Sequence, residues 1–358
     1  MEFLAEYGLF LAKAITIVLS IAVIIGLAVS SGHKGKPDKG HIEVTKLNDK
    51  LDMVKEALEE AVLSPEALKL QHKAKKKEDK AQQKSEKQAL KKSQKSGQEN
   101  LDAPLSKPRM FVLNFDGDIR ASAVENLREE ITAVLSLAKS TDEVLVCLES
   151  GGGMVHSYGL ASSQLARITQ QQVPLTVCVD KVAASGGYMM ACVADKILAA
   201  PFAILGSIGV VAQLPNFHRL LKKNNIDFEM LTAGEHKRTL TMFGENTDKG
   251  RAKFVEDLED THDLFKDFVA TNRPVVDVQK VANGDVWFGQ RALEQSLVDA
   301  LSTSDEYIVS RAGEADVFQV AFVFKKTIQE RFGFAAQASL DRLMLTWWGR
   351  LQSTRFFS

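Results

Sequence analysis

The chain has few cysteines and none of the motifs that usually hold a metal ion or a nucleotide. Its 358 residues include only Cys147, Cys178 and Cys192, and each lies in a short apolar run. Three thiols in such surroundings favour small buried side chains over a disulfide framework. The sequence also has no closely spaced Cys/His pair of the zinc-binding kind and no Gly-rich Walker loop. It therefore predicts neither a metal site nor another cofactor.

An excess of charge of one sign is also lacking. The 45 Lys and Arg residues nearly balance the 46 Asp and Glu residues, which leaves a formal net charge of -1. This balance argues against a nucleic-acid partner for the chain as a whole, although basic residues are concentrated near the N-terminus. With 45% hydrophobic residues the chain can fill a core, and its length suits one large domain or two small ones plus extra segments.

Residues 8–30 form an almost wholly apolar run that only Lys13 interrupts. The run is long enough to cross a hydrocarbon core of ~30 Å as a helix. A cleaved signal peptide would begin with basic residues and have a shorter apolar run, whereas this chain begins with Glu2 and Glu6. We therefore expect an uncleaved transmembrane anchor at residues 1–31, with the lipid bilayer as a partner.

The sequence gives less direct evidence for the side of the membrane on which the folded domain lies. Lys34, Lys36 and Lys39 follow the span closely, which favours a cytoplasmic location for the C-terminal side. Large domains can cross a membrane despite such charges, so the side that the folded domain occupies stays open.

Residues 32–107 are expected to link the anchor to the folded part. Within them, residues 41–70 have the spacing of an amphipathic helix, broken near Pro65, and a lysine-rich tract with few apolar residues follows. Such a tract is typical of a solvated helix or a disordered tether, and contact with anionic lipid headgroups is the alternative. At the other end, residues 326–358 have apolar residues at helical spacing, which predicts an amphipathic helix for assembly or membrane contact.

The folded part, residues 108–325, alternates strands with helices. Short buried strands are expected at residues 110–115, 144–148, 175–179 and 197–199. Helices are expected at residues 155–171, 185–194, 218–224, 249–272 and 291–297. Ser122, followed by Glu125 three residues on, also predicts a capping box. The alternation implies right-handed βαβ crossovers and a mostly parallel sheet in an α/β fold.

A glycine-rich turn follows the second predicted strand, where open α/β sheets form their sites. It reads Ser150-Gly151-Gly152-Gly153, and its bare backbone can turn tightly and present N–H groups to a ligand. Such donors could stabilise the oxyanion of a tetrahedral intermediate. A flexible turn is the alternative.

Ser185 lies at a predicted strand-to-helix turn among small residues. There its hydroxyl would project towards a substrate, and the Gly186 amide at the helix start would join an oxyanion hole with help from the helix dipole. A simple N-cap serine is the alternative. The turn is not a G-x-S-x-G elbow, because Ala183 replaces the first glycine.

A nucleophilic serine needs a general base. Lys237 could serve if burial lowered its pKa towards neutrality, whereas on its own it is expected to be a surface cation. Histidine is the other option: His236, His156 and His218 are candidates, with Asp195 as a third member. The residues alone leave the choice of base open.

Three segments together resemble the signal peptide peptidase A family of Ser-Lys peptidases. They are VDKVAASGGYMMACVADKI (179–197), APFAILGSIGVVAQ (200–213) and TAGEHKRTLT (232–241), in this order. The resemblance extends from the N-terminal anchor to about Leu301. It implies a Clp protease/crotonase-like fold, with Ser185 as the nucleophile, Lys237 as the general base and Ser207 as the residue that orients the lysine.

The resemblance also implies an oxyanion hole. Gly152 and Gly153 would act as donors beside Gly186, although Gly151 stands where the family has proline, which loosens the turn. His236 loses its claim as the base, because it occupies a variable position beside the matched lysine.

For the whole chain, the resemblance implies peptide or protein substrates and a homo-oligomer with the active site near a subunit interface. Lys237 could then serve Ser185 of an adjacent chain. A single-pass location in the bacterial inner membrane suits substrates such as signal-peptide remnants or misfolded envelope polypeptides. The alternatives are a catalytically silent membrane scaffold and a crotonase-like acyl-CoA enzyme.

Overall fold

The computed structural model describes residues 40–70 and 107–324, together with residues 8, 9, 13, 16, 17, 20, 73 and 80. The chain divides into two compact units, and one of them, Ile42–Phe322, contains nearly all of the described residues. In the described residues, no helix is both long and apolar enough to cross a membrane. Most of the expected anchor, the lysine-rich tract and the expected C-terminal helix lie outside the described residues.

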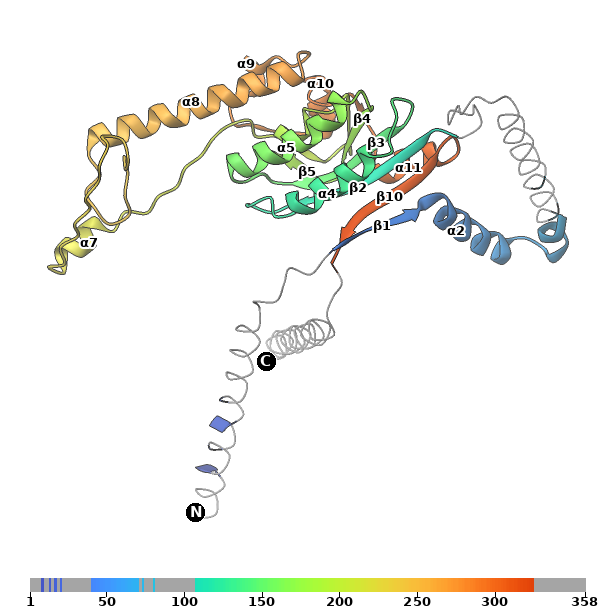
Figure 1. Ribbon diagram of the computed structural model, residues 1–358, viewed down its shortest axis with the longest axis horizontal. Coiled ribbons are helices and arrows are strands. Elements are labelled where there is room, and N and C mark those ends of the chain that lie inside the picture. Colours follow the sequence, from blue (N-terminus) through green and yellow to red (C-terminus); the bar gives the residue numbers. More distant parts are fainter. Residues whose placement is uncertain are drawn as a thin grey trace, which may run out of the picture. The chain divides into compact units, whose positions relative to one another are not determined.

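A ten-stranded sheet forms the centre of the described chain (Figure 1). Its main path runs in the order β1 (His41–Lys46), β10 (Asp316–Val323), β2 (Arg109–Gly117), β3 (Glu143–Ser150), β4 (Leu175–Val179), β6 (Lys196–Ala199) and β9 (Ala300–Leu301). The pairs from β10 to β9 are all parallel. The four strands expected from the sequence are therefore confirmed, as is the mostly parallel α/β sheet.

A short branch leaves the sheet beside the end of β3. It consists of β5 (Val182–Ala184), β7 (Ile204–Gly206) and β8 (Val286–Phe288). β5 pairs parallel with β3 and with β7, whereas β8 pairs antiparallel with β7. This branch positions the predicted nucleophile, because the chain passes from β5 directly into Ser185.

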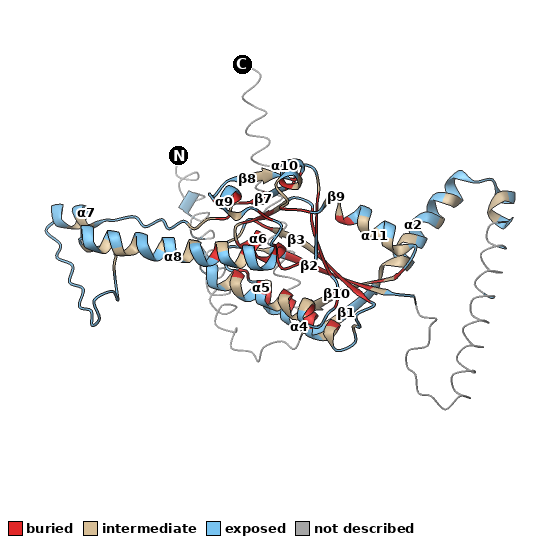
Figure 2. Cartoon of the chain, turned by 90° about the horizontal axis from the view of Figure 1, so that it is seen from above, coloured by how far each residue is buried: buried red, intermediate tan, exposed pale blue. Residues whose placement is uncertain are grey.

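Helices cover both faces of the sheet. Successive side chains of a strand point to opposite faces, so the strands supply apolar side chains to a core on each side. On one face, the strands pack against α4 (Val124–Leu135), α5 (Val155–Gln170) and α6 (Gly186–Ala191), and this is the larger core. The other face packs a smaller core against α2 (Leu47–Val62) and α11 (Ser304–Ala312). Figure 2 shows the buried residues along the strands and on one side of α4 and α5.

The remaining helices follow the predicted nucleophile in the sequence. They are α7 (His218–Lys223), α8 (Asp248–Asn272), α9 (Val278–Val281) and α10 (Gly289–Glu294). Between β7 and α8 the chain leaves the body, forms α7 at its far end and returns (Figure 1). We call residues 211–247 the arm. Most of its residues are exposed.

Two local expectations were wrong. The helix expected over residues 41–70 starts only at Leu47, because the preceding residues form edge strand β1. The capping box of Ser122 does not form, since α4 has Ala123 at its N-cap position and no side-chain cap. Instead, Asp118 accepts hydrogen bonds from the Ser122 hydroxyl and backbone N–H, both at 2.8 Å.

Candidate active site

Ser185 lies between β5 and α6 in a backbone conformation that non-glycine residues rarely adopt. Its φ is 52° and its ψ is -118°, and such strain costs of the order of 1–3 kcal/mol. A hydrogen bond from its N–H to the Gly206 carbonyl, at 2.8 Å, holds the turn in place. The side chain makes no cap hydrogen bond to α6. Ser185 thus occupies the N-cap position of α6 without capping that helix through its side chain.

Gly152 packs directly against this turn. Its φ is +85°, and a Cβ added there would lie 2.7 Å from the Ala184 carbonyl oxygen and 2.8 Å from the Ser185 Cβ. Only glycine tolerates both the backbone conformation and the close approach. The Gly152 N–H donates to the Ser150 hydroxyl at 3.0 Å. Gly152 therefore contributes shape beside Ser185, and its own amide already has an acceptor.

Two neighbouring amides lack such an acceptor. Gly153 packs against the backbone of Ile119, and Gly186 is the first residue of α6. Within residues 107–324, neither the Gly153 nor the Gly186 N–H has a hydrogen-bond acceptor. Both glycines line the same cavity as Ser185. The structure thus brings together a serine and two unpaired backbone donors, the arrangement that can stabilise an oxyanion.

The cavity beside Ser185 has a volume of about 340 Å³ and walls that are mainly apolar. Val155, Met189 and Val210 line it on the side of the body. The opposite wall comes from one face of α8, with Thr261, Leu264, Phe265 and Phe268. Because these α8 residues recur at helical spacing, one helix closes the cavity along its length. An apolar side chain of a ligand would fit such walls.

Ser207 lies close to Ser185 through the backbone. Gly206, whose carbonyl accepts the Ser185 N–H, immediately precedes it. Ser207 has a φ of 49°, and its N–H donates to the Asp285 carbonyl at 2.6 Å. His262 from α8 contacts the next carbonyl, that of Ile208, at 3.2 Å. The turn that carries Ser207 is thus held from two elements.

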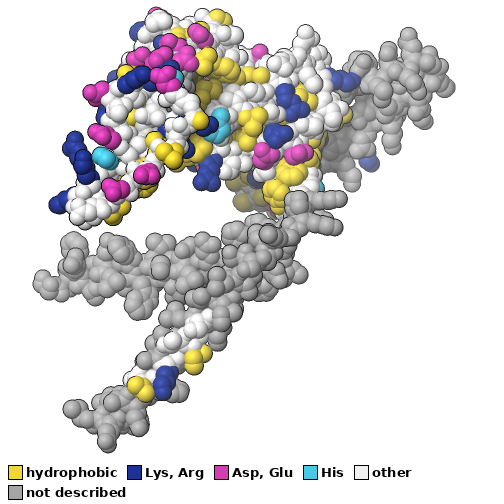
Figure 3. Space-filling view, turned by 60° about the vertical axis from the view of Figure 1, so that its left-hand side comes forward, with side chains coloured by type: hydrophobic (Ala, Val, Ile, Leu, Met, Phe, Trp, Pro, Cys, Tyr) yellow, Lys and Arg dark blue, Asp and Glu magenta, His cyan; other side chains and the backbone are white. Residues whose placement is uncertain are grey.

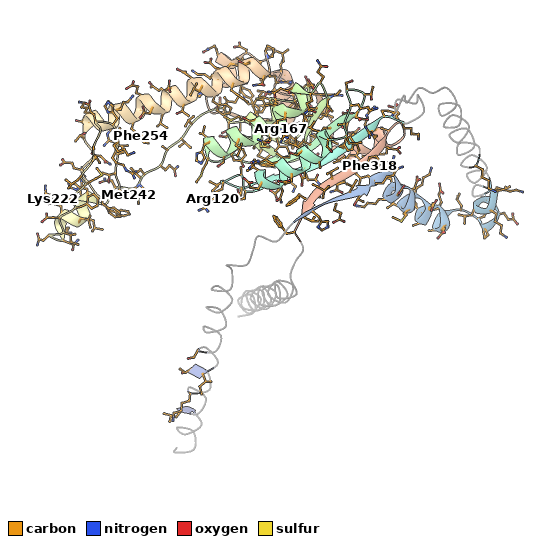
Figure 4. All side chains as sticks on the ribbon, viewed as in Figure 1. Arg120, Arg167, Lys222, Met242, Phe254 and Phe318 are labelled. Atoms are coloured by element: carbon orange, nitrogen blue, oxygen red, sulfur yellow. The ribbon has the colours of Figure 1, made fainter. Side chains whose placement is uncertain are left out.

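Lys237 lies on the arm and is exposed. Its N–H donates to the Gly234 carbonyl at 3.2 Å, which closes a local turn. Figure 4 shows Lys222 and Met242, which also belong to the arm. In the described part of the chain, Lys237 is not among the residues that line the Ser185 cavity. A single chain therefore brings Ser185, Gly153 and Gly186 together at one cavity, with Ser207 next to them in the backbone, whereas Lys237 lies elsewhere on the arm.

The rival histidine bases are not assembled either. His236 and His218 lie on the arm, and His156 is exposed on α5. Asp195, the expected third member, accepts a hydrogen bond from the Leu175 N–H at 2.8 Å and so supports β4. Among the described residues, none of these side chains lines the cavity, and no group of His, Cys, Asp and Glu could hold a metal ion.

Comparison with known proteins shows which protein family the chain belongs to. Residues 2–165 match the N-terminal region of peptidase family S49, and residues 167–317 match peptidase family S49 itself. A relative from Haemophilus influenzae, named "Probable protease SohB", is 50% identical over 338 residues, which are 94% of each chain. The chain belongs to peptidase family S49.

A second relative is similar over nearly its whole length. A "Probable protease SohB" from Buchnera aphidicola subsp. Acyrthosiphon pisum is 48% identical over 346 residues, 96% of this chain and 97% of that one. Among solved structures, a mutant of the 1510-N membrane-bound stomatin-specific protease with a substrate peptide is 12% identical. Its TM-score is 0.39 over 64% of this chain and 97% of that chain.

Proposed function

We propose that this member of family S49 is a serine endopeptidase with Ser185 as the nucleophile. The observation that carries the proposal is the strained turn at Ser185, whose side chain makes no cap bond and which shares a cavity with two unpaired amides. Strain of this kind persists only where surrounding contacts hold it, and it clusters at functional sites. The protease names of relatives at 50% and 48% identity agree with this chemistry.

The proposed reaction is acyl transfer. Ser185 attacks the carbonyl of a peptide bond, and a base takes its proton. The Gly153 and Gly186 amides are the favoured oxyanion donors, because the Gly152 amide already donates to Ser150. The base then returns the proton to the leaving amine, and a water molecule releases the acyl product.

We propose Lys237 as that base, supplied by a neighbouring subunit and oriented by Ser207. A lysine is a base only in its neutral form, which burial favours. In the single chain Lys237 is exposed on the arm. The arm also exposes large apolar side chains, with Val211 at 80% and Leu231 at 93%, and in Figure 3 hydrophobic side chains lie between charged groups on the visible face. A second copy covering the arm would bury both the apolar side chains and the lysine.

The substrates proposed are peptides or proteins with an apolar side chain next to the bond that is cleaved. The largely apolar walls of the Ser185 cavity support this preference. Together with an anchor at residues 1–31 in the bacterial inner membrane, signal-peptide remnants and misfolded envelope polypeptides are the proposed substrates. A Clp protease/crotonase-like fold, assembled into a homo-oligomer, belongs to the same proposal.

The test uses the full-length chain with Ser185→Ala and Lys237→Ala, each measured alone and after mixing. Each variant alone should lose cleavage of casein. In mixed assemblies, sites that combine an intact Ser185 with an intact neighbouring Lys237 should restore about a quarter of the wild-type activity. Full activity of Ser185→Ala would refute the nucleophile. Active single variants of Lys237, or no recovery on mixing, would refute the shared base.

A further inference from the structure

A buried pair of hydroxyl groups lies beneath the glycine turn. Tyr158, on the first turns of α5, is 0% exposed, and Ser150, at the end of β3, is 2% exposed. Their oxygen atoms are 2.5 Å apart. The Tyr158 hydroxyl also donates to the Asp118 carbonyl at 2.7 Å, and the Ser150 oxygen accepts the Gly152 N–H at 3.0 Å.

The protons in this network can be assigned by elimination. A tyrosine hydroxyl has one proton, and Tyr158 donates it to Asp118. The Ser150 hydroxyl has two acceptors within reach, the Tyr158 oxygen at 2.5 Å and the Gly117 carbonyl at 3.3 Å. Because Tyr158 donates its own proton to Asp118, we assign the Ser150 proton to the shorter contact, which leaves the lone pairs of Ser150 for the Gly152 N–H. The bonds therefore run in one direction, from Gly152 through Ser150 and Tyr158 to Asp118. Chains of this kind strengthen each other in a buried site, and burial also raises the pKa of Tyr158, which keeps it protonated.

The same tyrosine supports the other side of the oxyanion hole. A Cβ added at Gly186 would collide with the ring of Tyr158. The ring thus lies directly against the first residue of α6, while the hydroxyl group reaches the segment that precedes Gly153. One buried side chain contacts both segments that carry the proposed donors.

The glycine turn has no stiffness of its own. Gly151, Gly152 and Gly153 are consecutive, and glycine has the widest conformational freedom. The Gly152 N–H bond to Ser150 fixes the middle of the turn, where φ is +85°, and the Met154 N–H bond to the Ile119 carbonyl at 2.8 Å fixes its end. Because the Gly152 N–H already donates to Ser150, the Gly153 N–H is the amide of this turn that can donate to an oxyanion at Ser185.

We infer that Tyr158, acting through Ser150, is a positioning residue for the oxyanion hole. The inference rests on the proposed function of Ser185 and assigns a role to a residue that does not line the cavity. Tyr158 would not touch the substrate; it would set the position of the Gly153 and Gly186 amides. Its loss should therefore weaken stabilisation of the tetrahedral intermediate and leave ground-state binding of peptide intact.

The first test is Tyr158→Phe in the full-length chain, which removes only the hydroxyl group. We expect kcat to fall on the order of 10-fold, less than the 10²–10³-fold typical for complete loss of one oxyanion donor, with KM unchanged. The inhibition constant of a peptide aldehyde, which forms a tetrahedral adduct with serine, should rise by the same factor. The dissociation constant of the product peptide should not change.

The matched control is Tyr307→Phe, because Tyr307 also loses a hydroxyl bond, to Glu143 at 2.6 Å, but packs on the other face of the sheet. It should leave kcat and aldehyde inhibition at wild-type levels. Ser150→Ala should reproduce the effect of Tyr158→Phe, and the double variant should be no worse than either single one, since both break the same chain of bonds. An unchanged kcat for Tyr158→Phe, or equal losses in product and aldehyde binding, would overturn the inference.

Hydrogen exchange distinguishes failure of this inference from failure of the proposed function. In Tyr158→Phe the Gly152 amide should exchange faster than in the wild type, whereas in Ser185→Ala it should not. If Ser185→Ala stays fully active, the peptidase proposal fails, and the exchange data still decide whether Tyr158 holds the turn. If exchange at Gly152 is the same in Tyr158→Phe and wild type, the positioning role itself is refuted.

Discussion

The replacement Gly152→Ala tests how tightly the glycine turn and the nucleophile are packed together. A Cβ at this position would lie 2.7 Å from the Ala184 oxygen, 2.7 Å from the Gly186 nitrogen and 2.8 Å from the Ser185 Cβ. All three neighbours belong to the turn that carries the nucleophile, and two of them are backbone atoms. The methyl group can therefore be accommodated only if this turn or the glycine turn moves.

The expected cost has two parts. Alanine at a φ of +85° loses about 1–2 kcal/mol relative to a right-handed conformation. Forcing a methyl group into a filled space adds about 1–3 kcal/mol. The sum, about 2–5 kcal/mol, corresponds to a decrease in Tm of roughly 4–20 °C at 2–4 °C per kcal/mol. Displacement of the amides beside Ser185 should also lower kcat/KM by about 10²-fold or more.

Gly151→Ala is the matched control for both measurements. Nothing lies within 4 Å of a Cβ built at Gly151, and its φ is outside the left-handed region. This variant should keep its activity and gain stability slightly, since alanine restricts the unfolded chain by about 0.4–1 kcal/mol. The measurements are thermal unfolding and peptide cleavage on the full-length chain. If the two variants unfolded at the same temperature and cleaved equally well, the close packing of Gly152 on the nucleophile turn would be refuted.

Two further predictions concern buried carboxylates away from the site. Burial raises the pKa of Glu130, only partly offset by a hydrogen bond from the Phe322 N–H. The fold therefore loses stability as pH rises through the range between the unfolded and folded pKa values of Glu130, so Glu130→Gln should raise the free energy of unfolding at neutral pH. The gain should vanish in acid, and exposed Glu129→Gln should show none; a pH-independent gain would contradict the reasoning. Burial would also raise the pKa of Asp142, but hydrogen bonds from the Arg109 side chain and from the backbone N–H groups of Lys139 and Arg109 together outweigh it and hold that pKa below its usual range. Asp142→Asn should then cost about 3 kcal/mol in urea unfolding at neutral pH. The cost should shrink as the pH falls through the folded pKa of Asp142, and a cost that stayed constant into acid would contradict this assignment.

The larger part of the sheet could be predicted because its central strands have five or more residues and are mostly buried. The apolar runs at 110–115, 144–148 and 175–179 have few alternatives once helices separate them, and each became a central strand. The short strands β5, β7 and β8 have three residues each. Runs of that length have no periodicity of their own, and only tertiary pairing makes them strands. Edge strand β1 was missed for a related reason, since its exposed residues have no core face.

The serine and glycine residues of the site could be proposed from the sequence, because the backbone conformations that they adopt depend on residues next to them in the chain. A serine between small residues and a run of glycines can both be recognised in the amino-acid sequence. Tyr158 was not visible in this way. It lies on the buried face of α5 with Ala161, Leu165 and Ile168, at ordinary helical spacing, so the sequence gives it the pattern of a core residue. Its role depends on a hydroxyl partner from another element, which only the folded chain reveals.

The exposed position of Lys237 bears directly on its proposed role as the general base. A lysine acts as a base only in its neutral form, which burial favours, whereas Lys237 is exposed on the arm and does not line the Ser185 cavity in the described part of the chain. The rest of the proposed machinery, Ser185 with the Gly153 and Gly186 amides, is complete within one chain. Under the proposed function, the contact that buries the arm would also favour the neutral form of Lys237. An isolated chain would have Ser185 in place but no base to take its proton. In that proposal, a neighbouring copy of this chain would cover both the exposed apolar side chains of the arm and the exposed lysine.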